Sequence, residues 1–279
     1  MSVKIIVDST VDLTPEVRAQ VKVVPLSVRF GEAEYQDGVT ITPQKFYEML
    51  VASQELPTTS QPTPAAFEDV FREEVEAGNE VVCITIASKL SGTYQSATIA
   101  AGEFPGKVFV VDSRTAAIGS GILAQYALQL VQQGMGGEEI LNELMEIRRK
   151  IRLYFMVDTL EYLKKGGRLN AAVAVVGGLL NIKPILHVEE SGELKMLSTA
   201  RGMKKAFATL TELSGQDGGP DRSKPIMLAY TGVSDENLRR YREESREMWA
   251  DDTQTTIVGA AIGVHAGPGA VAAAFFSQE

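Results

Sequence analysis

The apolar segments of this chain alternate with helix-like segments, and this alternation restricts the fold more than any other feature. Runs rich in β-branched residues occupy positions 3–7, 21–30, 81–86 and 108–111. Helical patterns lie between several of them, as expected when strands are connected by helices that cross over a sheet. We therefore predict an α/β protein whose first half contains a mainly parallel sheet covered by helices.

Three Thr-Pro pairs mark expected helix starts: Thr14-Pro15, Thr42-Pro43 and Thr63-Pro64. A threonine hydroxyl accepts hydrogen bonds from free N–H groups at a helix start, and proline suits the first helical position because its missing N–H would have no partner there. The third helix also shows apolar residues at three-to-four spacing before a terminating glycine: Phe67, Val70, Phe71, Val75 and Gly78. A further amphipathic helix is predicted over residues 138–152.

The length of 279 residues favours two domains over one. We expect an N-terminal α/β domain over residues 1–153 and a C-terminal α/β domain with a hairpin over residues 154–279. The elements predicted for the second half are a strand at 153–157, a short helix opened by a capping box of Asp158 and Glu161 and closed by Gly166-Gly167, a hairpin of 185–188 with 194–198, a strand at 226–230, a charged helix at 235–249, a strand at 255–260 and an Ala-rich helix from about Ala270.

Composition excludes several classes of function. The net charge of -9 and the pI near 5.0 disfavour nucleic acids and anionic membranes as partners. The single cysteine, Cys83, lies in an apolar run and is expected in the core. With no signal peptide and no run of 18 apolar residues, the prediction is a cytoplasmic protein without stable membrane insertion. The longest apolar segment, 171–182, is interpreted as a buried loop or helix.

Three loops combine hydroxyl groups or glycine with an expected helix start. They are residues 57–64 (PTTSQPTP), 88–97 (SKLSGTYQSA) and 263–270 (GVHAGPGA). Unpaired N–H groups and the helix dipole favour a small anion at such positions. Simple helix capping with solvated hydroxyls explains the first two loops as well. His265, one of two histidines, stands in the third loop, where the glycines leave its ring accessible to a ligand.

Two arginines, Arg168 and Arg201, stand in glycine-containing turns away from the charged helices. Such a turn can offer the guanidinium group to a partner, although a solvated basic surface explains the same pattern.

Sharper motifs are weak or absent. Two loose dinucleotide-binding patterns, at 119–124 and 267–272, lack the strand or acidic residue that such a site needs. No phosphate-binding loop of the G-x-x-x-x-G-K-[ST] type occurs, and neither histidine has a partner at zinc-ligand spacing, so we expect no cofactor and no metal. Ser91 and His265 with Asp8 or Asp112 would make a hydrolase triad, but the G-x-S-x-G elbow is missing. The two aspartates are expected to brace loops at strand ends.

Taken together, the motifs resemble those of the DegV family, the fatty-acid-binding subunits that serve bacterial fatty acid kinase. The resemblance covers residues 3–277. It rests on DSTVDL at 8–13, TSQPT at 59–63, LSGTYQS at 90–96, GGR at 166–168, NIKPI at 181–185 and HAGPG at 265–269.

The resemblance implies two α/β domains with a long-chain fatty acid in a tunnel at their interface. Its carboxylate would be bound by Thr59, Ser91 and His265. The residues that support these head-group loops would be Ser60, Gly92, Thr93, Gly267 and Gly269. The carrier would have no nucleophile of its own.

The resemblance also implies partners. The bound acid would be presented to a separate ATP-dependent fatty acid kinase, giving an acyl phosphate for phospholipid synthesis, with an acyltransferase as a further candidate partner. Arg168 and Arg201 match positions that resemble a kinase-docking surface. The alternatives are a Ser/His-dependent hydrolase, a phosphotransfer protein like dihydroxyacetone kinase, and a carrier of another amphipathic acid.

Overall fold

The computed structural model describes residues 2–169, 181–216 and 218–278. The strands are β1 Val3–Asp8, β2 Lys22–Val24, β3 Ser27–Phe30, β4 Ala33–Gln36, β5 Thr58–Ser60, β6 Glu80–Thr85, β7 Val108–Asp112, β8 Ile151–Met156, β9 Ile182–Val188, β10 Leu194–Arg201, β11 Met227–Tyr230, β12 Gln254–Ile257 and β13 Val271–Phe276. The helices are α1 Pro15–Arg18, α2 Pro43–Ala52, α3 Pro64–Glu76, α4 Thr93–Ala101, α5 Ala117–Gln132, α6 Gly137–Ile147, α7 Glu161–Lys165, α8 Met203–Ser214, α9 Glu236–Glu244 and α10 Ala260–Ala266.

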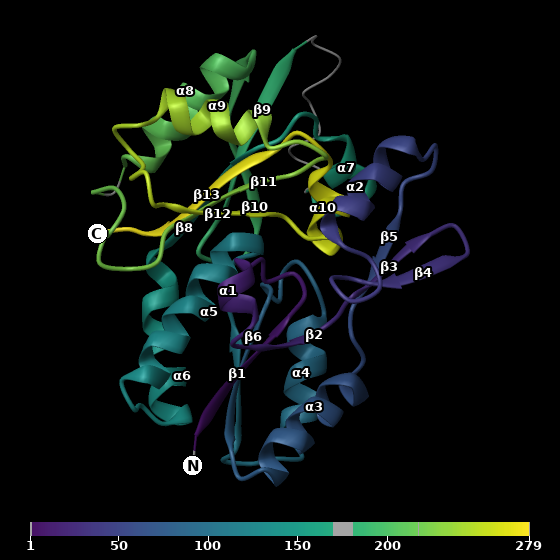
Figure 1. The fold of residues 1–279 in the computed structure, drawn as a ribbon, viewed down its shortest axis with the longest axis vertical. Helices are drawn as coiled ribbons and strands as arrows, with labels where there is room; N and C mark the ends of the chain where they lie inside the picture. The colour runs from purple at the N-terminus through teal and green to yellow at the C-terminus, as the bar shows by residue number, and fades with distance from the viewer. Residues whose placement is uncertain (1, 170–180, 217, 279) are drawn as a thin grey trace.

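The first half of the chain forms a four-stranded sheet in the order β2-β1-β6-β7, and all three pairings in it are parallel. Figure 1 shows α3 and α4 on one side of this sheet and α6 on the other. The predicted parallel sheet with covering helices is therefore confirmed. The three helices that begin after Thr14, Thr42 and Thr63 are also confirmed, since each threonine side chain accepts a hydrogen bond from the first turn of its helix.

The apolar run at 21–30 forms two strands in different sheets, β2 and β3. Pro25 stands between them, and because proline has no N–H it interrupts a ladder of hydrogen bonds. β3 instead pairs antiparallel with β4 and β5 in a small sheet of order β4-β3-β5, which projects to the right in Figure 1.

The second half forms a six-stranded mixed sheet in the order β10-β9-β8-β13-β11-β12. The predicted hairpin is confirmed as the antiparallel pair β9 and β10. α8 and α9 lie together above the sheet in Figure 1, and both contact its strands.

The predicted Ala-rich helix near Ala270 is wrong, because residues 271–276 form strand β13 in the interior of the sheet, between β8 and β11. Every residue of β13 is buried. Helix propensity of alanine amounts to only tenths of a kcal/mol per residue, whereas an interior strand gains hydrogen bonds on both sides and packs on both faces. Alternate residues of β13 enter different cores: Ala272, Ala274 and Phe276 in one, and Val271, Ala273 and Phe275 in the other.

α5 packs between the two large sheets. It contacts β1 and β6 of the four-stranded sheet and β8, β11 and β13 of the six-stranded sheet. The largest apolar core joins residues of both sheets to this helix, among them Val7, Ile118, Ile122 and Phe276. The expected division after residue 153 falls inside β8, which belongs wholly to the six-stranded sheet.

Three smaller predictions need correction. Asp158 and Glu161 form no capping box, because the Glu161 N–H donates to the Thr159 hydroxyl and Asp158 pairs with Lys183. α6 ends at Ile147, before a short 3₁₀ turn leads into β8, and α9 ends at Glu244. Most of the apolar segment 171–182 lies outside the described residues. Within the described ranges, no helix is long and apolar enough to cross a membrane.

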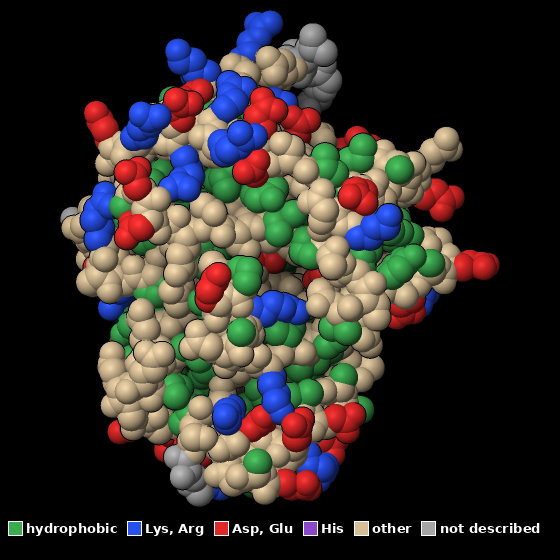
Figure 2. All heavy atoms as spheres, in the orientation of Figure 1, with side chains coloured by type: hydrophobic (Ala, Val, Ile, Leu, Met, Phe, Trp, Pro, Cys, Tyr) green, Lys and Arg blue, Asp and Glu red, His purple; other side chains and the backbone are tan. Residues whose placement is uncertain are grey.

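Charged side chains are most numerous at the top and bottom of the face in Figure 2, and others lie along its right edge. Acidic and basic groups are interspersed there, as in the exposed pairs Arg239–Asp235 and Arg240–Glu244 on α9. Such a mixture gives no broad field of one sign, in keeping with the expectation that charge does not attract nucleic acid to this face.

Candidate functional site

A cavity lies between the two large sheets, and its walls come from both halves of the chain. Its empty volume is about 840 Å³ including the space at its mouth, within the usual range of small-molecule sites. Most of the lining is apolar: Leu26, Ile86, Leu90, Ala116, Ala117, Leu153, Phe155, Leu163, Val188, Leu194, Val258, Ala261, Ile262, Ala266, Ala270 and Ala272. The polar lining residues are Thr10, Thr59, Ser91, Arg168, Thr231 and His265.

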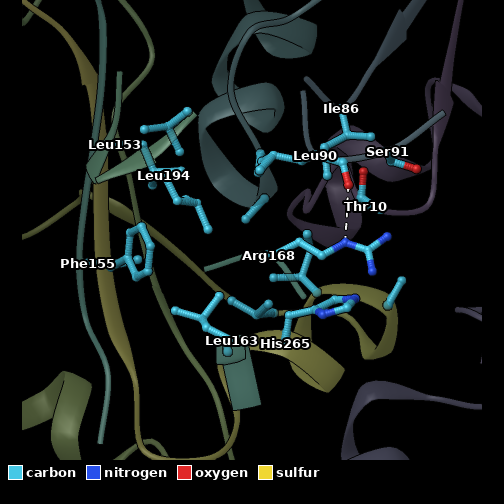
Figure 3. A pocket seen from close by; sticks show the side chains of 18 of the residues that line it. Thr10, Ile86, Leu90, Ser91, Leu153, Phe155, Leu163, Arg168, Leu194 and His265 are labelled. Carbon is cyan, nitrogen blue, oxygen red and sulfur yellow. Dashed lines mark hydrogen bonds between the residues drawn. The ribbon is translucent and has the colours of Figure 1, made fainter. Parts of the chain in front are cut away.

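Three polar side chains of the cavity lie at one end. Figure 3 shows Ser91, Arg168 and His265 near one another, whereas Leu153, Phe155 and Leu194 lie at the opposite end. Such an arrangement suits a ligand with one polar end and a long apolar part, because each part finds surroundings of its own polarity.

Thr59 and His265 meet directly at the polar end. Thr59 lies on β5 and His265 in the last turn of α10, and the Oγ1 and Nε2 atoms are 3.1 Å apart. The sequence places these residues 206 positions apart. The small antiparallel sheet therefore contributes to the site by presenting the Thr59 hydroxyl to α10.

Ser91 comes from the loop between β6 and α4, as expected. Its Oγ atom lies 2.8 Å from the Thr93 hydroxyl and accepts a hydrogen bond of 3.3 Å from the Thr93 N–H. Gly92 leaves room for the Gln61 side chain, because a Cβ atom on Gly92 would overlap the Gln61 amide. Thr93 thus hydrogen-bonds to Ser91, and Gly92 lets Gln61 pack against the same loop.

The expected position of His265 at a helix start is wrong. Residues 260–266 form α10, so the imidazole belongs to the end of a helix, and the chain then turns at Gly267 and Gly269 into β13. Burial, with a smaller effect of the positive charge of Arg168, lowers the pKa of His265 to about 4. The imidazole is consequently neutral near pH 7.

The two glycines after His265 are required by geometry. Both have positive φ, +68° at Gly267 and +86° at Gly269, where an L-residue is strained. A Cβ atom on Gly267 would also overlap the Tyr162 ring of α7. Gly267 thus lets α10 approach α7. In the described parts of the chain, the cavity lining includes neither Gly267 nor Gly269. It does not include Ser60 either, and Ser60 is exposed.

Arg168 is exposed and lines the cavity. Its Nε–H donates to the Leu90 carbonyl at 3.2 Å and its Nη1 group to the Gly166 carbonyl at 2.8 Å. The first bond joins the segment after α7 to the loop that carries Ser91. Arg201 is exposed at the end of β10 and is not among the lining residues found in the described chain.

In the described residues, neither Asp8 nor Asp112 hydrogen-bonds to His265, so Ser91 and His265 form no hydrolase triad with either aspartate. Asp8 accepts hydrogen bonds from Thr10 and from the Ile86 N–H, and Asp112 accepts from Ser88 and the Arg114 N–H. His265 Nδ1 is buried without a hydrogen-bond partner in the same residues. The expectation that both aspartates brace strand-end loops is confirmed.

Sequence reasoning missed most of the apolar lining and two polar lining residues, Thr10 and Thr231. Leu153 and Phe155 are two residues apart on β8, which indicates that both face the same side of the sheet. The pattern does not indicate which side faces a cavity. The motif that contains Thr10 was recognised only as a resemblance. For a metal, no group of three potential ligands occurs in residues 2–169, 181–216 or 218–278.

Comparison with known proteins decides the family. The model of the family described as "Uncharacterised protein, DegV family" matches residues 2–278. The chain belongs to the DegV family. A DegV domain-containing protein from Deinococcus radiodurans is 40% identical over 280 residues, which covers 98% of each chain.

Solved DegV structures share the mixed α/β fold. A DegV family protein from Thermus thermophilus, described by its fatty acid binding, is 36% identical, with a TM-score of 0.89 and complete coverage of both chains. A stearic-acid-binding protein from Eubacterium ventriosum is 28% identical, with a TM-score of 0.85 and coverage of 99% of this chain and 98% of that one.

Proposed function

We propose that this protein binds a long-chain fatty acid, with its carboxylate at Thr59, Ser91 and His265 and its acyl chain among the apolar residues of the cavity. One observation carries the proposal: Thr59, Ser91 and His265, from distant segments, line one cavity whose walls are mostly apolar, and Thr59 contacts His265 directly. The fatty acid binding of similar DegV structures supports the same ligand class.

The head-group chemistry is suited to a buried carboxylate. A carboxylate out of water is costly unless it accepts hydrogen bonds, and two hydroxyls with a neutral imidazole can donate them. Because His265 stays neutral near pH 7, the head group is bound by donors without a fixed ion pair at that residue. The Arg168 guanidinium lines the same cavity, but its hydrogen bonds go to the backbone carbonyls of Leu90 and Gly166.

Most of the binding free energy would come from the acyl chain. Each methylene group moved from water into an apolar site contributes about 0.8 kcal/mol. The wall residues Leu153, Phe155, Leu163 and Leu194 provide such a site. The polar end then determines orientation, and the apolar end determines affinity.

We further propose that the cavity is a tunnel between two domains and that the bound acid is presented to a separate ATP-dependent kinase, giving an acyl phosphate. The chain would then act as a carrier and not as an enzyme. The exposed Arg168, beside the head group, and the exposed Arg201 are the residues assigned to kinase docking. In support, Arg168 is exposed and lines the cavity, where a partner can reach it.

Native mass spectrometry of the protein purified from a bacterial host tests the binding function. We expect an additional mass equal to a long-chain fatty acid, strongly reduced in Ser91→Ala and His265→Ala. Ser88→Ala is a matched control, because Ser88 hydrogen-bonds to Asp112 and does not line the described cavity. A protein without bound lipid that hydrolyses model esters would contradict the carrier function.

The docking assignment needs a second experiment, with the cognate kinase and ATP. Arg168→Ala and Arg201→Ala should reduce acyl phosphate formation while the fatty acid stays bound. Full turnover in both variants would refute the assignment. Loss of bound fatty acid in Arg168→Ala would instead place Arg168 in the head-group site.

A further inference from the structure

Gly166 lies directly against the imidazole ring of His265. A Cβ atom added to Gly166 would overlap His265 Nδ1 and lie 2.9 Å from Cε1. The backbone angles at this position, φ -74° and ψ -5°, are accessible to any residue. The turn after α7 therefore does not require glycine here, whereas the position of the His265 ring does.

The same contact gives the two ring nitrogens different surroundings. Nε2 lies 3.1 Å from the Thr59 hydroxyl, while Nδ1 is buried and has no hydrogen-bond partner among the described residues. A proton on Nδ1 would be a buried donor without an acceptor, which costs about 1–3 kcal/mol. A proton on Nε2 can be donated to Thr59 or to a ligand oxygen. In folded proteins a buried acceptor without a partner is more common than a buried donor without one, so the form with the proton on Nε2 is favoured.

The packing around this contact is close. A Cβ atom on Gly267 would overlap the Tyr162 ring, so α7 and α10 approach each other through one glycine on each side. The Gly166 N–H donates to the Tyr162 carbonyl at 2.8 Å, which fixes the end of α7. On the side of Gly166 the His265 ring thus lies against backbone and not against a flexible side chain.

We propose that Gly166 is a positioning residue that leaves space for the His265 ring and keeps its Nε2–H directed at the carboxylate of the bound acid. The proposal rests on the proposed head-group role of His265. It assigns to the first glycine of the Gly166-Gly167-Arg168 segment a role beyond ending α7, since the glycine determines where the neighbouring ligand-binding group points.

The first test uses Gly166→Ala in the full chain after removal of bound lipid. Because the chain has two histidines, ¹⁵N spectra of labelled histidine give two sets of signals, which His187→Gln assigns. We expect the Nε2–H form of His265 in the unsubstituted protein and altered His265 signals in Gly166→Ala. Palmitate affinity should fall by about tenfold, the effect of losing one good charge-assisted hydrogen bond.

A matched control is Gly136→Ala. Gly136 precedes α6 with φ -76°, and a Cβ atom there would meet its nearest neighbour at an ordinary 3.5 Å. This variant should leave the His265 signals and the palmitate affinity unchanged. The proposal would be overturned by an Nδ1–H ring in the unsubstituted protein, or by unaltered His265 signals in Gly166→Ala.

A double-mutant cycle separates positioning from a general effect on folding. Gly166→Ala should lower the melting temperature by about 2–4 °C when His265 is present. In the His265→Ala background the ring is gone and the same substitution should cost clearly less, since only the tight contact with the Tyr162 carbonyl, at 3.0 Å, remains. Equal losses in both backgrounds would contradict the proposal. The histidine spectra and the melting temperatures need no ligand, so they test the role of Gly166 even if palmitate does not bind. Absence of palmitate binding would refute only the proposed function.

Discussion

The Thr59 hydroxyl and the His265 imidazole lie 3.1 Å apart, although 206 positions separate them in the sequence. Neither residue stands at a helix start, the position from which an anion site was first inferred. Thr59 is on an edge strand of the small sheet, and His265 ends a helix. Their contact joins that sheet to α10 at the polar end of the cavity, where a bound carboxylate would meet both groups.

Thr59→Val should weaken palmitate binding by about tenfold. Valine keeps the shape of threonine but removes the hydroxyl, whose hydrogen bond to a charged group contributes about 1.5–3 kcal/mol. Isothermal titration with lipid-free protein measures the change. Thr58→Val is the control, because Thr58 is an exposed neighbour on the same strand. An equal loss in both variants would show that the strand, and not the Thr59 hydroxyl, matters.

Ala272→Phe should shorten the acyl chains that the protein retains. Ala272 lines the cavity from β13, in a strand that tolerates aromatic residues, so a phenyl ring there would occupy space assigned to the chain. Mass spectrometry of the co-purified lipid should show a shift to shorter acids. An unchanged distribution would place the acyl chain elsewhere. Ala272→Ser, which adds one atom, should retain the original distribution.

Asp37→Ala should destabilise the protein by about 2 kcal/mol, as expected when buried N–H groups lose their acceptors. Both Asp37 carboxylate oxygens accept hydrogen bonds from the start of α10, at 2.9 Å from Ala260 N–H and 3.1 Å from Ala261 N–H. Urea unfolding measures the free energy of unfolding. Asp69→Ala, an exposed carboxylate on α3, should change it little. A loss of less than 0.5 kcal/mol for Asp37→Ala, on the order of an ordinary surface substitution, would contradict this role.

His265 should reduce stability in acid. The pKa of His265 is about 4 in the folded protein, and its reference value, taken for the unfolded chain, is 6.5. Between pH 4 and pH 6.5, therefore, the unfolded chain takes up the proton and the folded protein does not. The free energy of unfolding therefore falls as the pH drops from 6.5 towards 4, by up to about 3 kcal/mol from this group. His265→Gln should remove that part of the pH dependence. Unfolding in urea at pH 7 and pH 4.5 gives the comparison.

The buried carboxyl of Asp8 acts in the opposite direction. Burial raises its pKa from 3.8 to about 6, so the folded protein takes up this proton first, and Asp8 favours folding as the pH falls through that range. The total pH dependence combines both effects, and for this reason the His265 prediction is tested as a difference between variant and unsubstituted protein. Identical pH dependence of the two proteins would show that His265 titrates normally.

Local patterns determined much of the fold. The β-branched runs formed the parallel strands, and the Thr-Pro pairs began helices, because strand and helix preferences there depend on neighbouring residues. Order along the chain also fixed the hairpin of β9 and β10. The composition of the hydroxyl-rich and glycine-rich loops pointed to three loops that contain Thr59, Ser91 and His265, and only the family resemblance selected these residues for one carboxylate.

Tertiary structure decided the rest. Residues 271–276 became a strand because the interior of a sheet between β8 and β11 outweighs the helix preference of alanine. Burial between α7 and the cavity gives His265 its low pKa, and the approach of Gly166 gives its ring a direction. These properties depend on contacts between segments far apart in the chain, whereas the sequence by itself determines only which groups are available to make them.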